Sequence, residues 1–276
     1  MKNYTLITGA SQGFGKALAI ECAERNMNLI LVSLPRTGLI ELGEFLMKAY
    51  PIDVYCIEAD LTQTDQIRQV RREARQRSLK VQYLINNAGM LSQGLFEDLE
   101  CEYFQKQIAL NVLAPTILTR LFLNDLKECA PSGVLNVGSL ASYFYLPGKC
   151  VYGATKAYLS SFSQSLHREL KQMGISVTII SPGGMNTNPT LCCQNRCADR
   201  ITRLSVQEPE DVAYMAIQKM LQKKERVIPG KLNRFFLIMD ALLPKFVKDK
   251  IIQHELRHTR PGQIPERLER HRLHHA

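Results

Sequence analysis

The feature that most constrains the fold is a regular alternation of short apolar runs with longer segments of helical periodicity. The apolar runs are rich in Val, Ile and Leu and lack alternating polar residues, as strands buried on both faces do. Strands are predicted over residues 4–8, 28–33, 54–59, 81–86, 133–138 and 176–181, with a short one near 227. Helices are predicted over residues 13–26, 38–49, 65–77, 152–173 and 209–223, with a long one within 101–128. Because strands separated by helices favour right-handed crossovers, we expect an α/β fold, a doubly wound parallel sheet with helices on both faces.

The expected division into domains follows from what interrupts this alternation. No Pro-, Gly- or Ser-rich linker and no internal repeat occurs, so residues 1–230 are expected to form one domain. Residues 188–207 are irregular and are expected to form a loop. Residues 231–276 are a basic extension that is expected to be partly helical near 235–252.

Composition narrows the class of protein. Hydrophobic residues make up 45% and charged residues 22% of the chain, a balance that excludes a wholly disordered protein. The chain enters a predicted strand almost at once, with no signal-peptide pattern, and has no apolar run of the roughly 18 residues that a membrane helix needs. We therefore expect a soluble cytoplasmic protein.

The cysteines fit a reducing compartment. There are eight, and they are scattered, which argues against a disulfide framework. Within apolar stretches a thiol usually acts as a small buried group. This is expected of Cys22, Cys56, Cys101, Cys129 and Cys150.

The net charge of +9 leaves several partners open. A basic balance suits nucleic acid, an anionic membrane or a phosphorylated ligand, but no zinc-finger spacing or RNA-binding signature supports nucleic acid. About half of the excess lies in residues 231–276, where a solvated tail is the favoured interpretation. For the helical part, packing or an oligomer contact is favoured over peripheral membrane contact or a cover for a lipid-like substrate.

The first predicted strand leads into a glycine-rich turn, TGASQGFG, at residues 8–15. Gly9 permits a tight turn, Gly13 lets the backbone approach a ligand, and Gly15 lets the following helix pack closely on the strand. The helix start also offers free N–H groups to phosphate. Such a turn can be purely structural, but its place between the first strand and a helix predicts a dinucleotide site.

The end of the second predicted strand bears on the choice of cofactor. An acid there would bind the ribose 2′-hydroxyl of NAD, and none is present. Arg36 could instead pair with the 2′-phosphate of NADP, although a solvent-facing Arg in a turn is the alternative. NADP(H) is therefore preferred, with NAD(H) as the other candidate.

A second group of residues is predicted to do proton chemistry. Tyr152 and Lys156 lie at i and i+4 in YGATK, so they share one helical face. An ammonium near a phenol favours the phenolate and is expected to lower the pKa of Tyr152 from about 10 toward neutrality. The hydroxyl of Ser139, at the end of the fifth predicted strand, could stabilise charge on a carbonyl oxygen. An ordinary i, i+4 pair is the alternative for each residue taken alone.

The motifs TGASQGFG, NNAG, Asn111, Ser139, YGATK and SPGGMNT together resemble the short-chain dehydrogenase/reductase family over about residues 3–230. The resemblance implies a Rossmann-type dinucleotide-binding and catalytic domain. It implies that Tyr152 is the general acid in reduction and the base in oxidation, and that Ser139 polarises the substrate oxygen. Lys156 would lower the pKa of Tyr152 and bind the nicotinamide ribose, and Asn111 would hold a water in a proton relay.

The resemblance also implies the cofactor contacts. Asp60 resembles the residue that touches the adenine amine, the stretch 87–89 resembles the wall beside the adenosine ribose, and 182–187 resembles the loop that holds the nicotinamide carboxamide. The expected cofactor-binding set is Gly9, Ser11, Gly13, Phe14, Gly15, Arg36, Asp60, Leu61, Asn87, Ala88, Gly89, Tyr152, Lys156, Pro182, Gly183 and Thr187. Leu34 and Gln12 depart from the basic residues that many NADP-using members carry, so Arg36 is the main support for NADP.

The predicted function is an NAD(P)(H)-dependent oxidoreductase that interconverts a carbonyl and a secondary alcohol, reducing a ketone with NADPH. The tail resembles that of members acting on lipid, ketoacyl or steroid-like substrates. The alternative is a non-catalytic, cofactor-sensing binding protein on the same fold. The resemblance also implies a homodimer or homotetramer formed through the two long helices.

The loop 188–207 would be the family's variable substrate loop. Its Cys192, Cys193 and Cys197 lack a nearby His as a fourth ligand, so no metal is expected, and a lid that closes over the substrate is favoured. The substrate pocket is expected near Leu91, Ser92, Tyr143 and Phe144.

Overall fold

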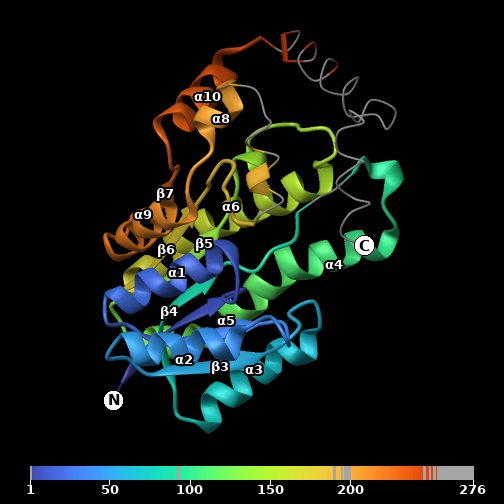
Figure 1. Cartoon of the computed structure of the whole chain (residues 1–276). Coiled ribbons are helices and arrows are strands. Elements are labelled where there is room, and N and C mark those ends of the chain that lie inside the picture. Colours follow the sequence, from blue (N-terminus) through green and yellow to red (C-terminus); the bar gives the residue numbers. More distant parts are fainter. Residues whose placement is uncertain are drawn as a thin grey trace.

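The computed structural model describes residues 2–91, 94–188, 191–193, 195, 200–244, 247–248, 250 and 253. Seven parallel strands form one sheet in the order β3-β2-β1-β4-β5-β6-β7 (Figure 1). The strands are β1 (Asn3–Thr8), β2 (Asn28–Ser33), β3 (Val54–Glu58), β4 (Lys80–Asn86), β5 (Ser132–Val137), β6 (Ile175–Ile180) and β7 (Arg226–Val227). The doubly wound α/β sheet expected from the sequence is confirmed. The strand order reverses between β1 and β4, which is where such sheets bind ligands at their carboxyl edge.

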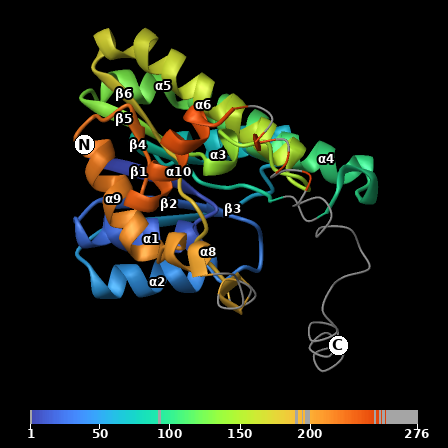
Figure 2. The ribbon, with the colours of Figure 1, turned by 90° about the horizontal axis from the view of Figure 1, so that it is seen from above.

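Helices cover both faces of the sheet, as Figure 2 shows from above. On one face lie α1 (Gly13–Glu24), α2 (Leu39–Ala49) and α9 (Pro209–Leu221), and on the other lie α3 (Thr64–Gln76), α5 (Ala114–Glu128) and α6 (Cys150–Leu170). The short α4 (Cys101–Ile108) precedes α5, while α8 (Arg200–Ser205) and α10 (Lys231–Leu242) lie beyond the carboxyl edge (Figure 1).

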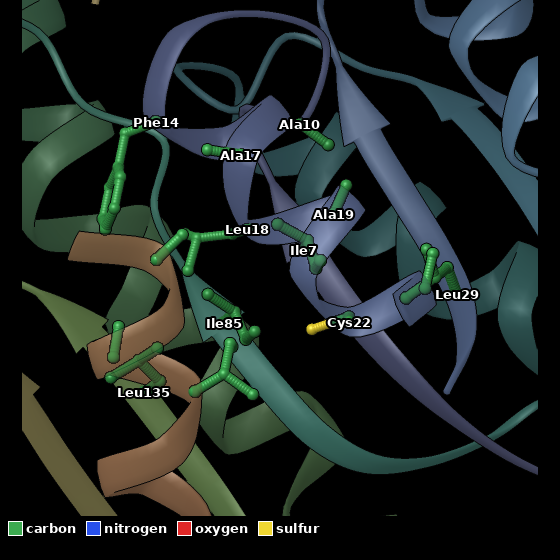
Figure 3. Packing of buried hydrophobic residues seen from close by; sticks show 14 of the residues in the cluster. Ile7, Ala10, Phe14, Ala17, Leu18, Ala19, Cys22, Leu29, Ile85 and Leu135 are labelled. Atoms are coloured by element: carbon green, nitrogen blue, oxygen red, sulfur yellow. The ribbon is translucent and has the colours of Figure 1, made fainter. Parts of the chain in front are cut away.

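The core divides into two apolar layers, one on each face of the sheet. Figure 3 shows the layer in which α1 contributes Ala17, Leu18 and Cys22, above Ile7 and Ile85 of the central strands. The opposite layer is built around Phe122 of α5, which is fully buried. The strands therefore have apolar residues on both faces, which explains their continuous Val/Ile/Leu runs.

The long helix expected within residues 101–128 contains a break in its hydrogen-bond pattern. Residues Ala109–Leu113 form a π-helical turn between α4 and α5. Such a turn inserts an extra residue and often lies at a functional site. Asn111 is at its centre and is buried.

The helix expected near residues 235–252 starts earlier and is interrupted, because α10 ends at Leu242 and residues 247, 248 and 250 are again helical. α10 begins at Lys231 and ends at Leu242, and Leu243 and Pro244 follow it in non-helical conformation. Proline disfavours helical geometry in the residue before it, so Pro244 explains the early end.

The expectation that the cysteines are buried is correct for Cys22 but wrong for Cys101 and Cys150, which are exposed. Both lie at the first residue of a helix, α4 and α6 respectively. Cys56 and Cys129 are half-buried. Across the ranges that the structure describes, no helix is both long enough and apolar enough to cross a membrane.

Candidate active site

At its three glycines, the turn after β1 leaves little room for a side chain. Gly9 and Gly13 have φ of +63° and +50°, a region that favours glycine. A Cβ on Gly15 would lie 1.9 Å from the carbonyl oxygen of Gly9, so α1 can pack against the turn only with glycine here. A Cβ on Gly13 would lie 3.1 Å from the Cβ of Thr187, which brings the expected pyrophosphate turn against the loop after β6. This narrow turn at a helix N-terminus fits a dinucleotide phosphate.

The ends of β1 and β4 are joined by side-chain hydrogen bonds. The Asn87 amide donates to the carbonyl oxygens of Thr8 at 2.9 Å and Gly9 at 3.1 Å. The backbone N–H groups of Asn87 and Ala88 both donate to the Thr8 hydroxyl, at 3.0 Å each. The Asn87 side chain therefore holds the glycine turn in place, a structural task beside its predicted contact with the ribose.

A cavity of about 420 Å³ lies at the carboxyl ends of β1, β2 and β3. Its lining includes the predicted residues Gly9, Asp60, Leu61, Ala88 and Gly89. Its position and size fit the adenosine half of a dinucleotide.

Arg36 is exposed beyond the end of β2 and is not among the residues that line this cavity. Its φ is +60°, and its backbone N–H donates to the Glu58 carboxylate at 3.0 Å. Leu34 lines the cavity instead. Ser11, which lines neither this cavity nor the catalytic one, hydrogen-bonds the Ser33 hydroxyl at 2.7 Å.

Tyr152 and Lys156 lie one turn apart at the start of α6, and both are buried, with 8% and 4% of their surface exposed. The Lys156 ammonium nitrogen lies 5.8 Å from the centre of the Tyr152 ring. It donates to the carbonyl oxygen of Val137 at 2.8 Å, which fixes it at the end of β5. The shared face predicted from the i, i+4 spacing is confirmed.

Burial sets the acidity of both groups. It lowers the pKa of Lys156 from 10.5 to about 8, because a desolvated ammonium is costly. It also raises the pKa of Tyr152, and the side-chain hydrogen bond with Ser139 opposes this rise. The expected net lowering of the Tyr152 pKa by Lys156 is therefore not found. Desolvation of the buried phenol is the largest cause of the raised pKa of Tyr152.

Ser139 follows β5 and begins the turn that leads toward α6. Its hydroxyl oxygen accepts a hydrogen bond from the Ala141 N–H at 3.1 Å. The N–H of the next residue, Leu140, donates to the carbonyl oxygen of Pro182 at 2.9 Å, which joins this turn to the loop after β6. Ser139 is thereby held between Tyr152 and the predicted nicotinamide loop.

Asn111 reaches the same place from the π-helical turn. Its Oδ1 accepts from the Met90 N–H at 2.8 Å, and its Nδ2 donates to the Met90 carbonyl oxygen at 3.0 Å and to the Thr155 hydroxyl at 3.1 Å. A Cβ on Gly89 would lie 3.3 Å from both the Asn111 Oδ1 and the Lys156 Nζ. Asn111 and Lys156 therefore approach the same point from two elements.

A cavity of about 530 Å³ lies above Tyr152 and Lys156 at the carboxyl edge of the sheet. The predicted residues that line it are Phe14, Asn87, Gly89, Tyr152, Lys156, Pro182, Gly183 and Thr187. Gly89 lines this catalytic cavity and the adenosine cavity, so the two adjoin as the halves of a dinucleotide would. The residues present thus fit a nicotinamide dinucleotide.

The expected substrate pocket is only partly correct. Leu91 and Phe144 line the catalytic cavity, and Ser92 falls outside the described residues. Tyr143 does not line it. The Arg226 guanidinium lies over the Tyr143 ring, 5.2 Å from its centre, and the Tyr143 hydroxyl is buried without a hydrogen bond.

Several residues of the cavity were missed by sequence reasoning. Asn233 and Phe236 of α10 line it, although the sequence placed them in an extension outside the domain, and that domain boundary remains a prediction. Asn233 is 2% exposed, which marks it as a buried polar group. An uncharged polar residue beside the apolar run FFLIM was the signal available. Lys106, which lines the adenosine cavity, gave no signal because a lysine on a helix is usually solvated.

The segment 188–207 contributes Leu191, Asn195 and Ser205 to the cavity lining, and it is not wholly irregular as expected, because α8 spans Arg200–Ser205. Cys192 and Cys193 are described and free, and Cys197 lies outside the described residues. Among the side chains that the structure describes, no three His, Cys, Asp or Glu residues form a group able to hold a metal.

A buried Tyr–Lys pair beside two adjoining cavities that fit the two halves of a dinucleotide is typical of one class of nicotinamide-dependent oxidoreductases. The model of the short chain dehydrogenase family matches residues 3–191, so the chain belongs to this family. It is 30% identical over 228 residues to the 3-ketodihydrosphingosine reductase of Bos taurus, covering 79% of this chain and 68% of the relative. It is also 30% identical over 189 residues to the 3-oxoacyl-[acyl-carrier-protein] reductase FabG of Buchnera aphidicola subsp. Schizaphis graminum, covering 68% and 76%.

A solved structure agrees over most of the chain. The short-chain dehydrogenase from Sphingobium yanoikuyae in complex with NADPH has a TM-score of 0.75 at 28% identity, covering 96% of this chain and 99% of that one. The chain is therefore a short-chain dehydrogenase/reductase, an oxidoreductase acting on CH–OH and keto groups.

Proposed function

We propose that the chain reduces a ketone with NADPH, and that its substrate carries a lipid-like or ketoacyl apolar part. The observation that carries the proposal is the buried pair Tyr152 and Lys156 at the floor of the catalytic cavity, next to Ser139. Two relatives named for the reduction of a ketosphingoid base and of an oxoacyl chain support the substrate class.

The lining of the catalytic cavity supports an apolar substrate. Beyond the catalytic groups, apolar side chains from four segments face it, and no acidic residue does so within the described chain. They include Leu91, Leu140, Phe144, Leu146, Met185 and Phe236. Apolar walls with a few polar groups at one end are typical of a site that orients a small apolar molecule.

The proposed roles of the catalytic residues are those that the family resemblance implies, and the positions of Tyr152 and Lys156 are compatible with them. Tyr152 donates its proton to the ketone oxygen during reduction and takes it back during oxidation, while the Ser139 hydroxyl donates a hydrogen bond to the same oxygen. Lys156 supplies positive charge to Tyr152 and a donor to the cofactor ribose, and Asn111 holds the relay that reprotonates it. The nicotinamide cofactor, when bound, supplies the hydride.

NADP is favoured over NAD because Arg36 is exposed beyond the end of β2, where the family resemblance expects the 2′-phosphate, and no acid follows that strand directly. A cytoplasmic homodimer or homotetramer is the proposed form. Its support is the exposed apolar surface formed by Ile108, Leu113 and Tyr158 on α4, the π-helical turn and α6.

The test of this function is the Tyr152→Phe variant with NADPH and a ketone panel. Loss of the phenol proton should lower kcat by about a thousandfold or more, while NADPH binding followed by fluorescence should change less than about threefold. Turnover like that of the wild type would remove Tyr152 from the mechanism. Tight NADPH binding by the wild type with no turnover of any ketone would favour a cofactor-sensing binding protein.

A further inference from the structure

A second apolar hollow lies beside the catalytic cavity. It has a volume of about 430 Å³ and lies between the segment 141–150 and the first two turns of α6. Its floor is made of small residues of α6, namely Gly153, Ala154 and Ala157. Among the described residues that line it, Lys149 is the only charged one. We call this hollow the α6 groove.

The α6 groove adjoins the catalytic cavity through shared walls. Four residues line both, namely Ala141, Phe144, Leu146 and Lys149. The side chains of Phe144 and Leu146 therefore stand between the two spaces. A molecule with its ketone at Tyr152 would pass between these apolar side chains and the charged Lys149 to enter the groove.

Local packing keeps the floor of the groove open. A Cβ on Gly153 would lie 3.0 Å from the carbonyl oxygen of Ala141, so the segment after β5 rests directly on α6 at this glycine. Ala154 and Ala157 are exposed, although the side chains around them are mainly apolar. Bulky residues at these positions would fill the groove.

We propose that the α6 groove binds the far end of the alkyl chain of a long-chain ketone whose carbonyl lies at Tyr152. This deepens the proposed function and rests on it. A linear apolar chain is the occupant that matches the small, apolar floor, and the shared walls give it a direct route from the catalytic cavity. The volume of each space falls in the range of small-molecule sites.

The first experiment measures kcat/KM for a series of straight-chain ketones of increasing length with NADPH. Complete burial of a methylene corresponds to about a fourfold gain, and burial of about half its surface in an open groove to about twofold. We expect gains of about twofold per methylene once the chain passes Phe144. The Ala157→Phe variant should abolish these gains and leave the kcat/KM of the shortest ketone that is turned over unchanged.

The matched control is Ser161→Phe, the same enlargement one turn further along the exposed face of α6 and outside the groove. It should keep the gain with chain length. The proposal is overturned if the wild type shows no gain with length, or if Ala157→Phe slows short and long ketones equally. Equal slowing together with a change in oligomeric state would assign the groove to an interface between copies. If the wild type turns over no ketone at all, the proposed function fails. If it turns over short ketones without a gain with chain length, only the proposal for the groove fails.

The second experiment needs no turnover. Cys150 lines the groove and is exposed, so its alkylation by iodoacetamide can be followed by mass spectrometry of the peptide. With NADP⁺ bound, a long-chain secondary alcohol should slow alkylation of Cys150 at least about fivefold, and a short-chain one should not. Cys101, exposed on α4, is the internal control. Equal alkylation rates of Cys150 with both alcohols would contradict the proposal.

Discussion

Tyr152 and Lys156 show how burial adjusts two ordinary side chains for proton chemistry. Lys156 loses most of its contact with water and gains one hydrogen bond, to the Val137 carbonyl. Its pKa falls to about 8, so it changes charge close to neutral pH. The same burial holds Tyr152 protonated, as a proton donor must be before reduction.

The lowered pKa of Lys156 has a cost in stability with a definite pH dependence. The unfolded chain binds this proton up to pH 10.5, whereas the folded chain binds it only up to about 8. Unfolding between these values takes up a proton, so this residue makes the protein less stable as pH falls from 10.5 to 8. One pKa unit corresponds to about 1.4 kcal/mol, so the full cost to stability is about 3 kcal/mol, and it is present at pH 7.

We therefore expect Lys156→Met to be inactive yet more stable than the wild type at pH 7, by about 1–3 kcal/mol after loss of the hydrogen bond. The difference should shrink as pH rises toward 10. Urea unfolding at both pH values measures it. Lys171→Met, at an exposed lysine after α6, should show no such pH dependence. An equal loss of stability at both pH values would mean that burial does not penalise this ammonium.

Arg36 decides the cofactor in the proposed function. Arg36→Leu removes the guanidinium that would face the 2′-phosphate, so KM for NADPH should rise about tenfold, the equivalent of about 1.4 kcal/mol. KM for NADH should change less than about twofold. Steady-state kinetics with both cofactors provide the measurement. A parallel change for the two cofactors would show that Arg36 does not distinguish them.

At the scale of elements, α10 depends on one buried side chain to stay on the catalytic cavity. The Asn233 amide donates to the carbonyl oxygen of Pro229 at 3.0 Å and to the Gln207 side chain at 3.3 Å. A Cβ on Gly183 would lie 2.8 Å from the same amide nitrogen. Asn233 thus ties α10 to the loop after β6 and to the end of the substrate loop.

Asn233→Ala should lower the free energy of unfolding by about 1–3 kcal/mol, because buried acceptors lose their donor. Since Phe236 lines the cavity from the same helix, KM for a ketone should rise several-fold, with a smaller change in KM for NADPH. Lys231→Ala, exposed at the start of α10, is the control. Stability loss without a change in ketone KM would limit α10 to a structural role.

At the scale of the whole molecule, the two apolar layers leave several large apolar side chains exposed, and three of them lie on the helices expected to form the oligomer contact. Ile108, Leu113 and Tyr158 are 43%, 46% and 40% exposed. They lie on α4, the π-helical turn and α6, and the hydrogen bond of Thr116 with Tyr158 at 3.0 Å joins α6 to the start of α5, directly after the π-helical turn. A surface of this kind is a candidate for contact between copies.

Light scattering after size-exclusion chromatography should therefore give the mass of a dimer or tetramer for the wild type. Ile108→Glu places a charge in the proposed contact and should shift the mass toward the monomer. Leu221→Glu, at an exposed leucine of α9, should not. A monomeric wild type at micromolar concentration would exclude this assembly.

Local pattern was enough to predict the order of the elements, the parallel sheet and part of the lining of the two cofactor cavities. The apolar runs mark strands buried on two faces, and the order of the motifs places Gly9, Ser139, Tyr152 and Lys156 at one edge of the sheet. Those features depend on residues close in sequence and on rules of chain connection.

Only the tertiary structure decided the features that arise where distant segments meet. These are the π-helical turn at Asn111, the placement of Asn233 over Gly183, the pKa directions of Tyr152 and Lys156, and the α6 groove. Hydrogen-bond partners, desolvation and the space left between side chains are set by packing across the whole fold. The pattern of residues within one segment therefore cannot predict these three properties.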